Sequence, residues 1–179
     1  MPSEQSEATS AFLEPMQHLL VGSDSAAEAI VLPERLDRSR LDFSLDSLQV
    51  IDQYLNDVHD NDQTVVGLSL LTTIWATALY VGEIIRRGAP AQYFEWVMLA
   101  DQQPASGGTT TSQVDLGAVR ALRAHDGELC LPSRAVLRVI LRGRKARSVH
   151  SFARGAIEAS TWAPNPLDPA EQANGASAP

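Results

Sequence analysis

The chain carries no charged residue from Thr64 to Gly82, and the first charge after this stretch is Glu83. Apolar residues in and just after the stretch recur at steps of three and four, the spacing of one helix face. They are Leu71, Ile74, Trp75, Ala78, Val81 and Ile85. A helix that is apolar on most sides must be covered by the rest of the protein. We therefore predict a buried central helix over about residues 64–87.

The same stretch is the one candidate for a membrane span, because its nineteen uncharged residues are long enough to cross a bilayer. Its serine and threonine residues, however, make it much less apolar than most membrane spans. The first ten residues, MPSEQSEATS, lack the basic region and apolar core of a signal peptide. We expect a cytoplasmic protein that does not enter the membrane.

The single cysteine, Cys130, excludes an internal disulfide and a zinc cluster built on several cysteines. His125 lies near it across a predicted hairpin, but a thiol between two leucines is more often a buried structural group than a nucleophile. The chain contains no G-x-S-x-G, P-loop, G-x-G-x-x-G or H-E-x-x-H motif. We expect no cofactor, and no motif favours an enzyme.

The net charge of −8 is unevenly distributed along the chain. Residues 1–63 hold thirteen Asp and Glu against three Arg, whereas residues 118–162 hold eight Arg and one Lys against three acidic residues. One interpretation is that the two halves attract each other within one fold. The other is that an acidic face serves a basic partner and a basic patch serves an anion.

Two helices are predicted on either side of the central one. Residues 45–58 place leucine, isoleucine and valine on one face, and Ser44 is a suitable N-cap before them. A helix over residues 134–141 follows Pro132, because proline is favoured at the first helical position. Gly143 then ends this helix.

A small antiparallel sheet is predicted between these helices. Residues 93–99, YFEWVML, are rich enough in aromatic and apolar side chains for a strand. Asp126 and Gly127 form a dipeptide typical of hairpin turns, so the segments 119–124 and 128–131 are expected to pair.

A last helix is predicted over residues 149–160, with Ser148 as its N-cap. The order of helices, then strands, then helices indicates an α+β fold, with a mostly helical body around the central helix. We expect a single domain over residues 8–162, between a flexible N-terminus at 1–7 and a disordered tail at 163–179.

Four segments of this order also carry a resemblance: LDFSLDSLQVIDQYL, ALYVGEIIRR, EWVML and LCLPSRAVLRVILRGRKARSVHSF. Over residues 41–155 the chain resembles a group of small bacterial proteins. Those proteins have a Ser-Leu-x-x-(Ile/Leu)-Asp helix, a Tyr-x-Gly-Glu helix, a Trp-bearing strand and a late Pro-led helix before a Gly turn. The group has no assigned function, and some members look like single-domain proteins found beside toxin and secretion loci. The resemblance implies the fold order and a bacterial protein of this kind.

Glu83 is the first candidate for a functional side chain, because it lies on the apolar central helix. One interpretation is a structural ion pair with Arg87, four residues later. The other is a partly buried carboxylate with a raised pKa, in a pocket with Tyr80, Thr73 and Arg87. Gly82, next to it, is expected to permit close approach of another element.

An acidic segment precedes the central helix and has residue types that bind metals. It lacks the glycine and glutamate that a calcium-binding EF-hand needs, and no second histidine lies at zinc spacing. We therefore expect a solvated turn and no metal. The candidate contact face for a basic partner consists of Asp52, Asp57, Asp60 and Asp62.

A basic cluster lies on and after the predicted helix at 134–141. Its members are Arg138, Arg142, Arg144, Lys145 and Arg147. The cluster is a candidate anion patch, for a phosphate or an acidic protein. With a net charge of −8 and no aromatic residues among the basic ones, sequence-specific nucleic-acid binding is not expected.

The leading hypothesis is a non-enzymatic, cytoplasmic module that binds another protein, such as an immunity or adaptor protein docking through its charged faces. The alternative is a small-molecule pocket protein or small enzyme that uses Glu83, Tyr80 and Arg87. A third possibility is a structural subunit that self-associates through exposed apolar residues. The sequence leaves the oligomeric state open.

Overall fold

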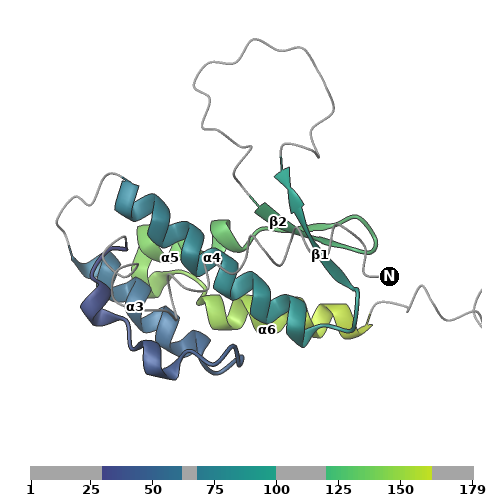
Figure 1. The fold of residues 1–179 in the computed structure, drawn as a ribbon, viewed down its shortest axis with the longest axis horizontal. Helices are drawn as coiled ribbons and strands as arrows, with labels where there is room; N and C mark the ends of the chain where they lie inside the picture. Colours follow the sequence, from purple (N-terminus) through teal and green to yellow (C-terminus); the bar gives the residue numbers. More distant parts are fainter. Residues whose placement is uncertain (1–29, 62–67, 100–119, 163–179) are drawn as a thin grey trace, which may run out of the picture.

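The computed structural model describes residues 30–61, 68–99 and 120–162. The expected flexible N-terminus at 1–7, the expected tail at 163–179 and the first residues of the expected central helix lie outside these ranges. Four longer helices and a three-stranded antiparallel sheet make up most of the described chain, as Figure 1 shows. The predicted α+β fold is confirmed.

Four helices pack into one body, in which two of them contact all the others. The helices are α3 (Leu48–Asp60), α4 (Leu68–Gly88), α5 (Pro132–Arg142) and α6 (Val149–Trp162). Both α3 and α4 pack against α5 and α6, which also touch each other. Short 3-10 turns stand at η1 (Pro33–Arg35), η2 (Arg38–Arg40) and η5 (Gly143–Lys145). Helices α5 and α6 therefore join the two halves of the body.

The predicted central helix is α4, and it is buried on every side over most of its length. Every residue from Ala76 to Ile85 is buried. Leu71 was expected to be the first residue of the buried apolar face, but its side chain is 54% exposed. The buried apolar residues of α4 begin about one turn later, at Ile74. Among the described residues no helix combines the length and the apolar character that a bilayer crossing requires.

Hydroxyl groups of α4 bind the chain segment that precedes α3. Thr73 Oγ1 accepts a hydrogen bond of 2.9 Å from the backbone N–H of Val31 and donates one to Ser69 O. The Tyr80 hydroxyl accepts one of 3.0 Å from the N–H of Phe43 and lies 2.8 Å from Ser47 Oγ. The polar residues that make α4 too polar for a membrane span thus hold a neighbouring segment inside the protein.

The sheet consists of β1 (Phe94–Met98), β2 (Arg120–Ala124) and β3 (Leu129–Cys130), paired antiparallel in that order. The predicted hairpin between β2 and β3 is confirmed. Gly127 has φ of 87°, a conformation that glycine adopts without strain, and its N–H donates to Ala124 O over 2.9 Å. Asp126 stabilises the same turn by accepting the N–H of Glu128.

Helix α3 begins three residues later than predicted. Ser47 stands at its N-cap, whereas Ser44, the predicted cap, uses its Oγ to accept the N–H of Ser47 over 3.2 Å. Ser44 therefore caps a turn that leads into the helix. The α5 prediction holds more closely, with Pro132 in its first turn and Gly143 at its C-terminal end.

Candidate functional site

Glu83 is buried, with a relative exposure of 2%, and it keeps its charge through two arginines. Its carboxylate accepts hydrogen bonds of 2.9 and 2.7 Å from Arg86 and one of 2.7 Å from Arg87 Nε. Burial raises the pKa of Glu83, but the hydrogen bonds and charges of Arg86 and Arg87 outweigh it and hold the pKa below its ordinary value. The raised pKa expected for a functional Glu83 was therefore wrong.

The four residues of the expected pocket do not converge on one site. Thr73 and Tyr80 use their hydroxyl groups to bind the segment before α3, rather than Glu83. Arg87 lies 4.4 Å over the ring of Phe43, which itself packs against Tyr80. This arrangement is an ion pair, a cation–π contact and a tilted aromatic pair, which together hold α4 to its surroundings.

Asp52, a member of the expected acidic face, has a structural role. Its carboxylate oxygens accept the backbone N–H groups of Val149 and His150 over 2.7 and 3.1 Å, so it caps the N-terminus of α6. Burial raises the pKa of Asp52, although these two N–H groups act in the opposite direction. A carboxylate held in this way is not available as a surface contact.

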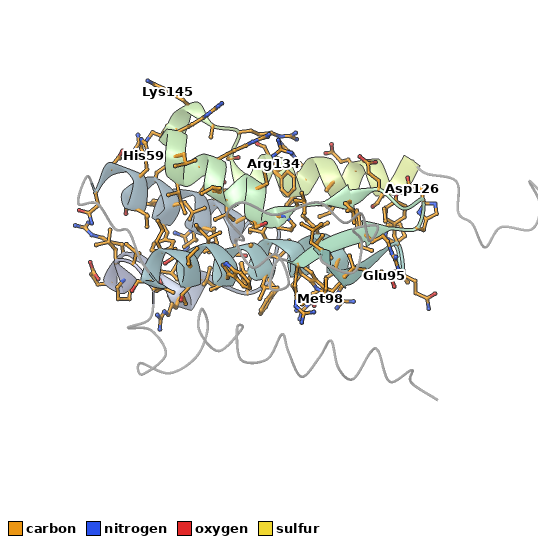
Figure 2. The ribbon with its side chains drawn as sticks, turned by 90° about the horizontal axis from the view of Figure 1, so that it is seen from above. His59, Glu95, Met98, Asp126, Arg134 and Lys145 are labelled. Carbon is orange, nitrogen blue, oxygen red and sulfur yellow. The ribbon has the colours of Figure 1, made fainter. Side chains whose placement is uncertain are left out.

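Two other members of the expected acidic face, Asp57 and Asp60, lie at the C-terminal end of α3. Asp57 is half-buried and Asp60 is exposed, while Asp62 lies outside the described residues. Beside them, His59 Nδ1 lies 2.8 Å from Ile140 O, and its ring packs against Gly143 at the end of α5. Figure 2 shows His59 and Lys145 at the same end of the molecule. The acidic and basic segments are thus neighbours, yet no ion pair joins them among the described residues.

Cys130 and His125 do not form a nucleophile and base. Cys130 pairs with Leu122 in the sheet, whereas the ring of His125 packs 4.5 Å from the ring of Tyr93. Burial, with a contribution from Glu128, raises the pKa of the Cys130 thiol to about 12. The thiol therefore stays protonated near neutral pH. Within the described ranges, no group of three His, Cys, Asp or Glu side chains is placed to hold a metal ion.

Helix α5 presents an exposed surface that combines positive charge with apolar side chains. Its inner side consists of Ala135, Val136 and Val139, which are buried against the other helices. On its outer side Leu137 is 39% exposed and Leu141 is 67% exposed. The exposed cations of α5 and of η5, which follows it, are Arg134, Arg138, Arg142, Arg144 and Lys145. We call these seven residues the basic face.

The cations of the basic face have no ion pair with any described residue. Figure 2 shows that Arg134, at the start of α5, and Lys145, in η5, lie on the same side of the molecule. Arg147, the last member of the expected anion patch, follows η5, and its guanidinium donates a hydrogen bond to Ser151 O in α6. The sequence identified most of these cations, but it did not identify Arg134, Leu137 and Leu141 as their neighbours.

A cavity of about 490 Å³ opens between the sheet, α5 and α6. Its walls include Phe94 from β1, Leu129 from β3 and Phe152 from α6. None of the four residues of the expected Glu83 pocket lines it.

Comparison with models of protein families, with curated proteins and with solved structures found no match to the chain.

Proposed function

We propose that this protein is a non-enzymatic binding module that docks an acidic protein partner on the basic face of α5. The observation that carries the proposal is the placement of two exposed leucines, one helical turn apart, among five cations that have no ion pair with any described residue. Apolar anchors with a charged rim are the usual composition of a protein interface.

The leucines supply the affinity in this proposal. Leu141 is 67% exposed, although α5 has a separate inner side that already contributes to the core. Covering the exposed two thirds of this side chain with a partner contributes roughly 1–2 kcal/mol, because its apolar surface leaves water. Leu137, one turn earlier, extends the same apolar strip along the helix.

The cations supply the selectivity. They attract a partner with negative charge and accelerate its approach, and they disfavour a basic one. The acidic end of α3 lies next to η5, which disfavours the continuous phosphate backbone of a nucleic acid. A protein partner with a local cluster of carboxylates satisfies both conditions.

The proposal keeps the expected protein partner and changes its charge. A basic partner would need the acidic face, but Asp52 is engaged in capping α6. An immunity or adaptor role is compatible with docking through one helix face. We also propose a cytoplasmic location, because a chain with a single cysteine forms no internal disulfide.

The test is affinity capture from cells that produce the protein, with wild type, Leu141→Ser and Leu71→Ser as baits. Leu71, on α4, is a matched control because it is another leucine with more than half of its surface exposed. We expect an acidic protein to bind wild type and Leu71→Ser, to be released as the salt concentration rises, and to be lost from Leu141→Ser.

A charge control accompanies these baits. Arg138→Glu reverses a charge on the basic face, whereas Arg154→Glu makes the same change on the exposed surface of α6. The acidic partner should be lost only with Arg138→Glu. Equal capture by all variants, capture of a basic protein, or no captured partner would contradict the proposal.

A further inference from the structure

We propose that the cavity between the sheet, α5 and α6 binds a small organic anion that joins an acidic group to an apolar ring or chain. This site shares Arg134 and Arg138 with the basic face, but it is a concave pocket, and Leu137 and Leu141 lie outside its lining. Its occupant is expected to be a molecule rather than a single ion, since about 490 Å³ falls within the range of small-ligand sites.

The walls of the cavity set the apolar part of the ligand. Two aromatic rings line the cavity, Phe94 from the sheet and Phe152 from α6. Leu129 of β3 adds an aliphatic side chain to the same lining. Such walls favour a flat ring or a short alkyl chain, which gains by leaving water. An inorganic ion alone would leave these walls uncovered.

The charges in the lining set the polar part of the ligand. Arg134 and Arg138 enter from α5 and Arg147 from the segment before α6, against one carboxylate, Glu128. Neither α5 arginine is paired with a described residue. Guanidinium groups bind carboxylate or phosphate oxygens through charge-assisted hydrogen bonds, so the lining favours an anion.

The guanidinium of Arg147 occupies space that the absence of a side chain at Gly155 leaves open. Its Nη2 donates a hydrogen bond of 2.7 Å to Ser151 O, and it lies 2.6 Å from the point where a Cβ on Gly155 would stand. Any side chain at position 155 would therefore displace the guanidinium. Glycine is a poor helix former, yet at this position it lets a cation lie against the wall of the cavity.

The test uses a matched pair of fluorescent probes on the full chain. 8-Anilinonaphthalene-1-sulfonate carries an anion on an aromatic body, and N-phenyl-1-naphthylamine is a neutral molecule of similar shape. We expect the anionic probe to bind the folded protein with a higher affinity than the neutral one. Phenyl phosphate and benzoate should displace the anionic probe, and their relative affinities compare a phosphate with a carboxylate. Inorganic phosphate, which lacks the ring, and phenol, which lacks the acidic group, should displace it poorly.

Two variants remove the anion contact by different routes. Arg147→Gln deletes the cation, and Gly155→Ala displaces it while improving the helix. Each should lower the affinity for the anionic probe by about tenfold or more, the effect of one lost charge-assisted hydrogen bond. The affinity for the neutral probe should not change. Arg154→Gln is the control, since it removes the same charge from an exposed residue of α6 that lies outside both the lining and the basic face.

Thermal unfolding of each variant establishes that it is folded before the titrations are compared. The proposal is overturned if wild type binds neither probe, or if it binds both equally. It is also overturned if Arg154→Gln weakens binding of the anionic probe as much as Arg147→Gln does, because the effect would then be one of net charge. Unchanged binding in both Arg147→Gln and Gly155→Ala would overturn it as well.

Discussion

Glu83 remains ionised inside the protein because two arginines reach it from the next turn of α4. Arg86 binds both carboxylate oxygens and Arg87 binds one, while the two arginine side chains stay partly exposed, at 42% and 47%. The carboxylate of the cluster is therefore buried, while its two arginines reach the solvent. Trp96 Nε1, 3.5 Å away in β1, covers the carboxylate from the sheet side.

Glu83→Gln should make the stability of the protein less dependent on acid pH. The folded-state pKa of Glu83 lies below its ordinary value of 4.5, so its ionic contribution is present above that value. It is lost as the pH falls through the lowered folded-state pKa. We expect the variant to be less stable by about 1–3 kcal/mol near neutral pH, with a difference that shrinks as the pH falls below the ordinary pKa of 4.5.

Urea unfolding at a series of pH values measures this difference, and Glu95→Gln serves as its control. Glu95 pairs with Arg123 on the exposed surface of the sheet, where an ion pair contributes at most about 1 kcal/mol. A constant difference between wild type and Glu83→Gln across the pH range would mean that the ion pair does not explain its stability.

The environment of these residues was harder to predict than their local partners. The Glu83–Arg87 pair follows from helical spacing, and the sequence identified it. The contact of Glu83 with Trp96 comes from a strand that follows the helix. Asp52 is a stronger case, because the N–H groups that it caps lie 97 and 98 residues later in the chain. No local pattern contains that information.

Two glycines show how single positions set the approach of whole elements. A Cβ on Gly82 of α4 would lie 2.2 Å from Trp96 Cη2 in β1 and 3.2 Å from Pro132 Cγ in α5. The expected close approach at Gly82 is therefore present, with a strand and the start of a helix as the neighbours. On α6, a Cβ at Gly155 would meet only the flexible end of Arg147.

The same substitution should have opposite effects at these two positions. Gly82→Ala should lower the free energy of unfolding by about 1–3 kcal/mol, since the Trp96 ring and Pro132 must move. Gly155→Ala should raise it by up to about 1 kcal/mol, because alanine favours the helix and the arginine can turn away. Urea unfolding of both variants measures the effects, and a change of the same sign at both positions would refute this description of the packing.

Elements with a local signal were predicted well, and those built by distant contacts were not. The hairpin at Asp126 and Gly127 and the bounds of α5 depend on neighbours in sequence. The segment before α3 belongs to the second kind. It forms η1 and η2 and places Leu36 and Leu41 in the core, because hydroxyl groups of α4 bind its backbone.

At the scale of the whole molecule, the helical body with a small antiparallel sheet follows from the order of apolar patterns along the chain. The candidate sites do not, because they combine distant segments. The basic face did leave a signal: α5 has apolar residues on two sides, and Leu137 and Leu141 exceed what its inner face requires. The cavity left none, since β3, α5 and α6 meet there only after folding.

The central claim, that an acidic partner docks on the basic face, is tested most directly by photo-crosslinking inside the producing cells. A photoreactive amino acid replaces Leu141 in one version of the protein and Leu71 in the other, so that both probes occupy exposed leucine positions. We predict one cross-linked acidic protein from position 141 and none from position 71. Cross-links from both positions alike, from position 71 alone, or to a basic protein would contradict the claim.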